Sequence, residues 1–300
     1  MAETQKPVFK DSIKGKMNKK SNSHFDEIWQ RLRKNKVAYV SFYILLLLGG
    51  IALLADVIAP YAYSEQNLTN ILRGPSAEHW FGTDQYGRDI FSRVLYGARI
   101  SLSVGFIAVG VALVVGGMLG AIAGFYGGKI DNVIMRCMDI LLSIPSVLLA
   151  LAIVATFGTS IINLMIATGI STVPSYARLI RAAILSIKDQ EFVEAARAVG
   201  TNDFVIITQH ILPNCLAPIL VQATFGVATA ILTVAGLSFV GLGLQPPIPE
   251  WGSMLSDART YIRDYAYMMV PPSIAIALTV FCLNSLGDGL RDALDPKLRD

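Results

Sequence analysis

The chain has 300 residues, of which 53% are hydrophobic and 16% charged; its formal net charge is +3 and its mean hydropathy +0.53. This composition lies outside the range of ordinary soluble domains and favours a membrane protein. The small net charge gives little support to nucleic-acid binding. The three cysteines, Cys137, Cys215 and Cys282, are too scattered to indicate a disulfide framework or a metal cluster.

The N-terminal segment is polar and basic. Ten of the 25 Lys and Arg residues lie between Lys6 and Lys36, just ahead of the first apolar run. Such a tail can bind nucleic acid, but beside an apolar span it more often fixes that side of the membrane as cytoplasmic. We therefore interpret residues 1–36 as a cytoplasmic basic tail. The first apolar run is too long for the core of a cleavable signal peptide.

Six apolar runs are long enough to cross a bilayer, which takes about 17–25 residues. The expected spans are residues 37–59, 100–125, 140–157, 161–177, 216–239 and 265–286. Six spans place both termini and the polar segment 178–210 on one side, and 19 of the 25 Lys and Arg residues fall on that side. This agrees with the excess of basic residues in cytoplasmic segments. The sequence therefore predicts an all-α polytopic membrane protein with six transmembrane helices.

Glycines and prolines occur at informative places within these spans. Gly116, Gly120 and Gly124 are four residues apart, a spacing that lets helices pack closely, and we prefer this interpretation to a gating role. Pro145 and Pro174 lie inside expected spans, where a proline either frees a carbonyl toward a pathway or makes a packed kink.

The polar outer segment, residues 60–98, contains two acid–base pairs at helical spacing. Asp84 precedes Arg88 by four residues, and Asp89 precedes Arg93 by four. This order favours ion pairs on a helix surface. We predict a solvated or interfacial helix rather than a catalytic site, because no nucleophile or metal-ligand set accompanies these charges.

The segment from Glu191 to Asn214 is the largest polar interruption in the second half of the chain. Asp189 or Ser186 can cap a helix that runs to Val199, and Gly200 suits a left-handed C-cap. Thr201 can begin a second helix that ends near Pro213. Ala195, Ala196 and Ala198 would keep one side of the first helix slim enough to fit a groove. The alternative is an ordinary helical hairpin lying on the membrane.

The sequence lacks the motifs of a self-energised transporter or an enzyme. Gly128-Lys129 is the nearest approach to the phosphate-binding G-x-x-x-x-G-K-[ST] pattern and fails it, since residue 123 is Ala and Ile130 follows the lysine. Gly236-Leu237-Ser238-Phe239-Val240 misses the G-x-S-x-G nucleophile motif at its last position. The spans hold almost no ionisable residues, which disfavours an ion-driven carrier. We expect no catalytic residue, no cofactor and no metal site.

Several segments resemble a known family. Glu194-Ala195-Ala196, followed by Gly200 and later by Leu212-Pro213, resembles the E-A-A-x-x-x-G loop of bacterial ABC importer permeases, although His210 stands where that family usually has Ile. Three further segments are similar to the C-type permeases of oligopeptide, dipeptide and nickel importers. These are Trp80-Phe81-Gly82-Thr83-Asp84 with Gly87-Arg88-Asp89, the loop Pro246-Pro247-Ile248-Pro249-Glu250-Trp251-Gly252, and the tail Gly287-Asp288-Gly289-Leu290-Arg291-Asp292-Ala293-Leu294-Asp295-Pro296.

This resemblance implies a type I ABC importer permease fold in the bacterial cytoplasmic membrane and a subunit that is not itself an enzyme. The implied partners are a homologous second permease, two cytoplasmic ATP-binding subunits, an extracytoplasmic substrate-binding protein and membrane lipid, but no nucleic acid. The residues expected to couple to the ATPase are Glu191, Glu194, Ala195, Ala196, Arg197, Gly200, Leu212 and Pro213. The residues expected to meet the binding protein or line the pathway mouth are Pro247, Glu250 and Trp251.

The chain is accordingly divided into five parts and assigned a substrate class. The parts are the tail 1–36, the first span 37–59, the extracytoplasmic segment 60–98, a five-helix core 99–290 that contains the cytoplasmic coupling loop 186–213, and a cytoplasmic tail 291–300. Peptides are the expected substrate, with a nickel chelate or another small solute as the alternative. A stand-alone channel or secondary carrier, and a membrane enzyme, are the rivals from other classes.

Overall fold

The computed structural model describes residues 24–294, so most of the predicted basic tail and the last six residues of the C-terminal tail lie outside the described residues. Within this range the regular elements are all helical, which confirms the predicted all-α class; an isolated bridge joins Thr83 to Asp89. The longer helices are α2 (His24–Lys34), α3 (Lys36–Ile58), α4 (Ile90–Tyr126), α5 (Gly128–Leu142), α6 (Ser146–Phe157), α7 (Ile161–Leu185), α8 (Glu191–Ala198), α10 (Leu216–Leu237), α11 (Trp251–Ala258) and α12 (Val270–Leu294). The short turns are η1 (Leu68–Asn70), α9 (Asp203–Val205), η2 (Ile206–Ile211), η3 (Leu212–Cys215), η4 (Ser238–Leu242), η5 (Arg259–Tyr261) and η6 (Ala266–Met268).

Four continuous helical stretches within residues 24–294 are long and apolar enough to cross a membrane. They are Lys36–Ile58, Ile90–Tyr126, Asp203–Leu242 and Ala266–Leu294. The α5–α6 pair, bent by 82°, counts as a fifth span if it crosses as one unit. Helix α7 has the length of a span, at 25 residues, but its Ser, Thr, Asn and Arg residues lower its hydropathy. The described residues thus support four or five of the six predicted spans.

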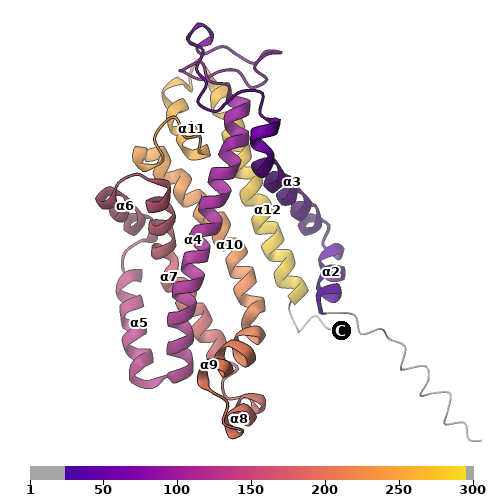
Figure 1. Ribbon diagram of the computed structural model, residues 1–300, viewed down its shortest axis with the longest axis vertical. Helices are drawn as coiled ribbons and strands as arrows, with labels where there is room; N and C mark the ends of the chain where they lie inside the picture. Colours follow the sequence, from indigo (N-terminus) through magenta and orange to yellow (C-terminus); the bar gives the residue numbers. More distant parts are fainter. Residues whose placement is uncertain (1–23, 295–300) are drawn as a thin grey trace, which may run out of the picture.

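The long helices run side by side, and the connecting segments gather at the two ends of the molecule (Figure 1). Because α4 begins at Ile90, the outer segment covers residues 59–89 rather than the predicted 60–98; it lies at one end together with α11, whereas α8 and α9 lie at the opposite end. We call these the outer-segment end and the α8 end. The α5–α6 bend lies at about mid-height between them (Figure 1).

Helices α4 and α7 pack against each other along the glycine stripe of α4. A Cβ atom added to Gly116 would lie 2.6 Å from the carbonyl oxygen of Val173, and one added to Gly124 would lie 3.1 Å from that of Arg181. A Cβ on Gly120 would overlap the carbonyl oxygen of Ala177. The partners on α7 are themselves four residues apart, so the two helix backbones stay in close contact over two turns. The predicted close packing is confirmed.

The third predicted span, residues 140–157, is not a straight helix. Helix α5 ends at Leu142, and Pro145 occupies the N-cap of α6. A proline cannot donate the backbone hydrogen bond that a continuous helix needs at this position. The second predicted span is also longer than expected, since α4 begins at Ile90 rather than near residue 100.

The charged residues of the outer segment form a buried network instead of the predicted solvated helix. Asp84 and Arg88 lie in a turn, 6% and 1% exposed. Arg88 pairs with Asp84 at 2.6 Å and reaches Asp257 of α11 at 3.5 Å. Arg93, 2% exposed, does not pair with Asp89; it lies 3.7 Å from Asp84 and donates to the carbonyl oxygen of Pro247. The network therefore joins the outer segment to α4 and α11.

Asp89 has a different role from the one predicted. One carboxylate oxygen accepts from the backbone N–H of Ser92 at 2.7 Å and caps α4, and the other lies 2.9 Å from Nδ1 of His79. The acid thus starts α4 and at the same time fixes the outer segment on it.

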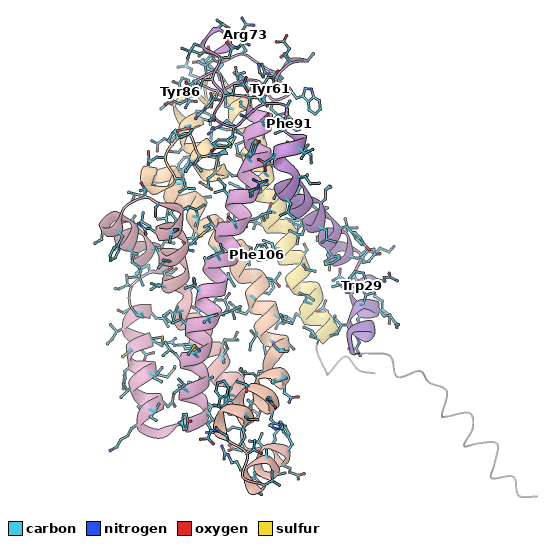
Figure 2. The ribbon with its side chains drawn as sticks, in the orientation of Figure 1. Trp29, Tyr61, Arg73, Tyr86, Phe91 and Phe106 are labelled. Atoms are coloured by element: carbon cyan, nitrogen blue, oxygen red, sulfur yellow. The ribbon has the colours of Figure 1, made fainter. Side chains whose placement is uncertain are left out.

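Aromatic side chains gather at the outer-segment end and around α2. Figure 2 shows Tyr61, Tyr86 and Phe91 at the outer-segment end, and Trp29 on α2. The ring of Trp29 lies 5.3 Å from that of Phe42 in an edge-on arrangement. Amphipathic rings of this kind are common where a membrane protein meets the headgroup region.

Candidate functional site

Helix α8 is short and carries acidic residues in its first turn. It covers Glu191–Ala198, and Glu191 and Glu194 lie where the helix dipole favours negative charge. Gln190 occupies the N-cap and makes no side-chain cap hydrogen bond. The predicted cap at Asp189 or Ser186 is therefore wrong: Ser186 is the C-cap of α7.

The end of α8 confirms the predicted role of Gly200. Its φ is +78°, a left-handed conformation that residues with a side chain rarely adopt. The N–H of Gly200 donates to the carbonyl of Arg197 at 2.9 Å, and that of Thr201 donates to the carbonyl of Ala196 at 3.1 Å. These two bonds form a Schellman motif that closes the helix and turns the chain.

The second helix of this segment begins close to the expected position but does not stop at Pro213. Asn202 caps it by accepting from the N–H of Phe204 at 2.9 Å. The chain then continues through α9, the π-helical η2 and η3 into α10, so that Asp203–Leu242 is one helical stretch. Pro213 lies in the first turn of η3, where a missing N–H is tolerated. The α8 segment is thus joined directly to a membrane-spanning helix.

One face of α8 is buried against the helical body. Val193 is fully buried and Ala196 is 8% exposed. They belong to an apolar cluster, which we call the α8 cluster, made of Ala121 and Phe125 of α4, Ile180 and Ile184 of α7, Val193, Ala196, Ile206, Ile211, Cys215 and Ile219. The expectation that Ala196 helps to form a free, slim side is therefore wrong, because that side chain faces the protein.

The other face of α8 is exposed and partly apolar. Glu191, Glu194, Ala195 and Ala198 are exposed. Three large apolar side chains are also exposed around it, namely Phe192 at 39%, Val199 at 81% and Phe204 at 72%. Exposed apolar groups rimmed by charged ones are typical of a protein–protein contact surface.

The remaining predicted coupling residues, Arg197, Leu212 and Pro213, differ in their exposure. Arg197 is exposed, and its guanidinium carbon lies 5.0 Å from the ring centre of Phe125, so it also binds the last turn of α4 by a cation–π contact. Leu212 is half-buried against the α8 cluster, whereas Pro213 is exposed. The structure therefore brings the predicted coupling residues to one end of the molecule. Some of them pack against the helical body, and the others are exposed.

The outer loop places two of its three predicted contact residues inside the protein. Glu250 and Trp251 are each 1% exposed. Glu250 caps α11 by accepting from the N–H groups of Gly252 and Ser253, both at 2.8 Å. Trp251 donates from Nε1 to the carbonyl oxygen of Val94 at 3.0 Å. Neither side chain faces a partner in this conformation, whereas Pro247 is exposed.

The buried charge network was not predicted. Its only signal in the sequence is the four-residue spacing of Asp84 and Arg88, whereas the contact with Asp257 of α11 joins Arg88 to a residue about 170 positions later. Within residues 24–294 no group of three or more His, Cys, Asp or Glu side chains is placed to hold a metal ion.

Comparisons with known proteins agree with this arrangement. Residues 116–300 match the family described as "Binding-protein-dependent transport system inner membrane component", and residues 23–75 match the "N-terminal TM domain of oligopeptide transport permease C". A dipeptide transport system permease protein of Alkalihalophilus pseudofirmus is 52% identical over 277 residues, which cover 92% of this chain and 91% of that protein. A glutathione transport system permease protein of Escherichia coli is 47% identical over 274 residues, 91% of this chain and 90% of that protein.

A solved structure supports the fold. The MetNI methionine ABC transporter in an inward-facing conformation contains a chain that matches 68% of this chain and is itself 97% covered, with a TM-score of 0.55 and 20% identity. At this identity the likeness concerns the fold alone.

Proposed function

The chain belongs to the family of inner-membrane components of binding-protein-dependent transport systems, as a permease subunit of an ABC importer, and we propose that it moves di- or oligopeptides into the cell. The peptide assignment rests on relatives named for dipeptide and glutathione transport, at 44–52% identity over about nine-tenths of the chain. Glutathione is itself a tripeptide. A nickel chelate is the alternative solute, and uptake measured with labelled dipeptide, glutathione and nickel chelate distinguishes the three.

The proposed assembly contains this chain, a homologous second permease, two cytoplasmic ATPase subunits and an extracytoplasmic binding protein. The apolar side chains that line α3, among them Leu53 at 78% and Val57 at 81% exposed, supply a surface for lipid or for the second permease. On the outer side we keep Pro247 as the proposed point of contact with the binding protein, because Glu250 and Trp251 are buried.

In the proposed topology six segments cross the inner membrane and both termini are cytoplasmic. The bent α5–α6 pair and α7 are the third and fourth spans. In this topology the cytoplasmic side holds more of the Lys and Arg residues of the described chain than the outer side does, eleven against six, and this excess supports the assignment of the α8 end to the cytoplasm. The eleven are Arg31, Arg33, Lys34, Lys36, Lys129, Arg136, Arg178, Arg181, Lys188, Arg197 and Arg291.

The observation that carries the coupling role is the division of α8 into two faces. Its exposed face, with Phe192 and Glu194, is available to the ATPase subunit. Its buried face, with Val193 and Ala196, packs on the ends of α4 and α7 and on the start of the α10 stretch. A movement of the ATPase that displaces α8 would therefore act on three membrane helices at once. ATP-driven closure of the ATPases would in this way switch the pathway between its inward and outward openings.

Substitutions at Glu194 and Gly200 test this role. Glu194→Lys reverses a charge on the exposed face, and Gly200→Val places a branched side chain at a φ of +78°, which strains the turn. We expect each to lower peptide uptake by about tenfold or more, the scale of an interface hot spot. ATP hydrolysis stimulated by the binding protein should fall with it, while membrane insertion persists.

The control is Glu78→Ala, at an exposed glutamate of the opposite end. It should leave co-purification of the ATPase subunits unchanged. Normal uptake and normal ATPase co-purification in both Glu194→Lys and Gly200→Val would overturn the docking role. Flux through this chain reconstituted without any ATPase would instead favour a stand-alone channel or carrier.

A further inference from the structure

A hollow lined by neutral side chains, seven of them polar, lies at mid-height in the helical body. Its volume is about 260 Å³, many times the roughly 10–15 Å³ that one water molecule needs. It is lined by the middle of α7, by α10, by Val109 of α4 and by the break between α5 and α6. The polar lining residues are Ser146, Ser171, Thr172, Ser175, Tyr176, Gln222 and Thr229, and the others are Val109, Leu142, Ile144, Pro145 and Gly226. Within residues 24–294 no charged side chain lines the hollow.

The side chain of Gln222 is the least satisfied group of this lining. It is half-buried, and within residues 24–294 it makes no side-chain hydrogen bond. An amide without a partner is costly in an apolar environment, so it is found where it meets protein, water or a ligand. Ser146 and Ser175 are exposed toward the same hollow and are likewise without side-chain hydrogen bonds in the described part of the chain. Lipid is a poor neighbour for all three.

Other hydroxyl groups of the lining already use their protons. Thr172 donates to the carbonyl oxygen of Gly169 at 2.9 Å, and Thr229 donates to that of Phe225 at 3.0 Å. The phenol of Tyr176 donates to the backbone carbonyl of Gln222 at 3.3 Å. Each oxygen keeps lone pairs that can accept a hydrogen bond. The hollow thus offers several fixed acceptors and one amide that can both donate and accept.

The break between α5 and α6 also lines this hollow. Pro145 and Ser146 interrupt the helix within the hollow, where the 82° bend lies at mid-height (Figure 1). Irregular backbone at membrane depth is tolerated where it is buried in protein or lines a water-filled cavity. In secondary transporters, discontinuous helices near the midplane commonly form the substrate site.

We propose that this hollow is the part of the transport path in which the chain binds the peptide groups of the substrate. The binding uses hydrogen bonds from uncharged groups and does not discriminate between substrates by the charge of their side chains. A peptide unit brings one N–H donor and one C=O acceptor, which match the acceptor hydroxyls and the Gln222 amide. The proposal rests on the proposed function, because it requires that the transported solute is a peptide. It assigns this role to α7, α10 and the α5–α6 break.

Paired charge substitutions at Gln222 test the recognition. Gln222→Glu should lower uptake of an acidic dipeptide relative to a basic one by about tenfold or more, and Gln222→Lys should shift the same ratio the other way. Gln222→Leu should raise the half-saturating concentration for a neutral dipeptide by about three- to tenfold, the effect of one neutral hydrogen bond. Because the uptake of the acidic and the basic dipeptide is compared within one variant, a general loss of folded protein does not change their ratio. Equal losses for acidic and basic dipeptides in both charged variants would overturn the proposal.

Cysteine labelling of the assembled complex tests the hollow independently of peptide specificity and covers the case in which charged variants fail to insert. Ser175→Cys and Thr229→Cys, made in a Cys137→Ser background because Cys137 is exposed, should react with a membrane-impermeant thiol reagent. They should react about tenfold or more faster than Ile170→Cys, an exposed apolar position on another face of α7. The bulky adducts should then block uptake.

Labelling of Ser175→Cys and Thr229→Cys no faster than that of Ile170→Cys would overturn the proposal and indicate a dry contact with the second permease or with lipid. Rapid labelling that leaves uptake unchanged would also overturn it. Failure of the proposed peptide function is distinguishable, since it appears as absent peptide uptake by the unmodified complex, whatever the labelling pattern.

Discussion

Arg88 donates from Nε to Oδ2 of Asp84 at 2.6 Å, and the two side chains are 1% and 8% exposed. The other carboxylate oxygen of Asp84 accepts from the backbone N–H groups of Tyr86 and Arg88, at 2.9 and 3.0 Å. Arg93 lies 3.7 Å from the same carboxylate. Asp84 therefore compensates two buried cations and also fixes the turn that precedes α4.

Asp84→Asn removes the charge on which both arginines depend. Breaking a buried pair by removing one partner costs about 3–5 kcal/mol, because an uncompensated charge stays behind. We expect a marked fall in the thermal unfolding temperature of the detergent-solubilised protein, and loss of the order around residues 72–89. Asp257→Asn is the matched control, because the side chain of Asp257 is 26% exposed and its carboxylate lies 3.5 Å from Arg88, a weaker contact than the 2.6 Å pair of Arg88 with Asp84. An equal loss in the two variants would contradict the central role of Asp84.

Asp257 should also make a measurable contribution to pH dependence. Burial raises the pKa of its carboxyl above the usual 3.8, outweighing the opposing attraction of Arg88 and Arg93. The folded state then keeps this proton to a higher pH than the unfolded state does. The stabilising contribution of the protonated form is fully present below the unfolded pKa and is lost as pH rises through the folded pKa.

Asn mimics the protonated form and does not titrate. As pH rises from about 4, the unfolding free energy of the unmodified protein should therefore fall relative to that of Asp257→Asn, and the difference should become constant above the folded pKa. Thermal unfolding of both proteins across this range is the measurement. If instead the unmodified protein becomes more stable relative to Asp257→Asn as pH rises, then attraction by the arginines, and not burial, determines the direction of the pKa shift of Asp257.

The glycine stripe gives a second stability test, with a control on the same helix. Gly120→Ala would bring a methyl group onto the carbonyl oxygen of Ala177 and force α4 away from α7. Such overpacking costs about 1–3 kcal/mol. Gly110→Ala has no heavy atom within 4 Å of its new Cβ, so it should be neutral or stabilising by up to about 1 kcal/mol, as alanine favours the helix. Comparable losses in both variants would place the cost in the helix itself and not in the contact with α7.

Much of this architecture was readable from the sequence because it depends on local patterns. Long apolar runs predicted α3, α4, α10 and α12, and Gly200 predicted a left-handed turn. These features follow from hydropathy and backbone sterics alone.

The predictions that were wrong concern residues whose burial is set by tertiary contacts. The four-residue spacing of Asp84 and Arg88 suits a helix, yet the pair lies in a buried turn covered by α11. Ala196 and Ala195 are neighbours of the same type, but only Ala196 faces the α8 cluster, because that choice is set by the ends of α4 and α7. Trp251 looked like an exposed loop residue, but it donates to the carbonyl oxygen of Val94 in α4, and no sequence pattern near Trp251 records that contact. Glu250 differs, because it caps α11 through the N–H groups of Gly252 and Ser253, two and three residues later in the sequence.

The two faces of α8 allow docking and transmission to be separated. Val193 is fully buried in the α8 cluster, and its neighbour Phe192 is 39% exposed. Val193→Ala removes two methyl groups from the anchor and costs about 1–3 kcal/mol locally. It should lower peptide uptake while the ATPase subunits still co-purify, because the exposed face is unchanged. Phe192→Ala should instead weaken co-purification, since it truncates the surface offered to the partner.

The decisive measurement is uptake divided by the amount of ATPase recovered with the complex. This ratio should fall in Val193→Ala, where the ATPase is bound but its movement reaches α4, α7 and α10 less effectively. It should stay near the unmodified value in Phe192→Ala, where the complexes that do form are coupled normally. If Val193→Ala loses the ATPase to the same extent as Phe192→Ala and keeps a normal ratio, then the buried face of α8 only supports the fold of the docking surface, and movement reaches the membrane helices by another contact.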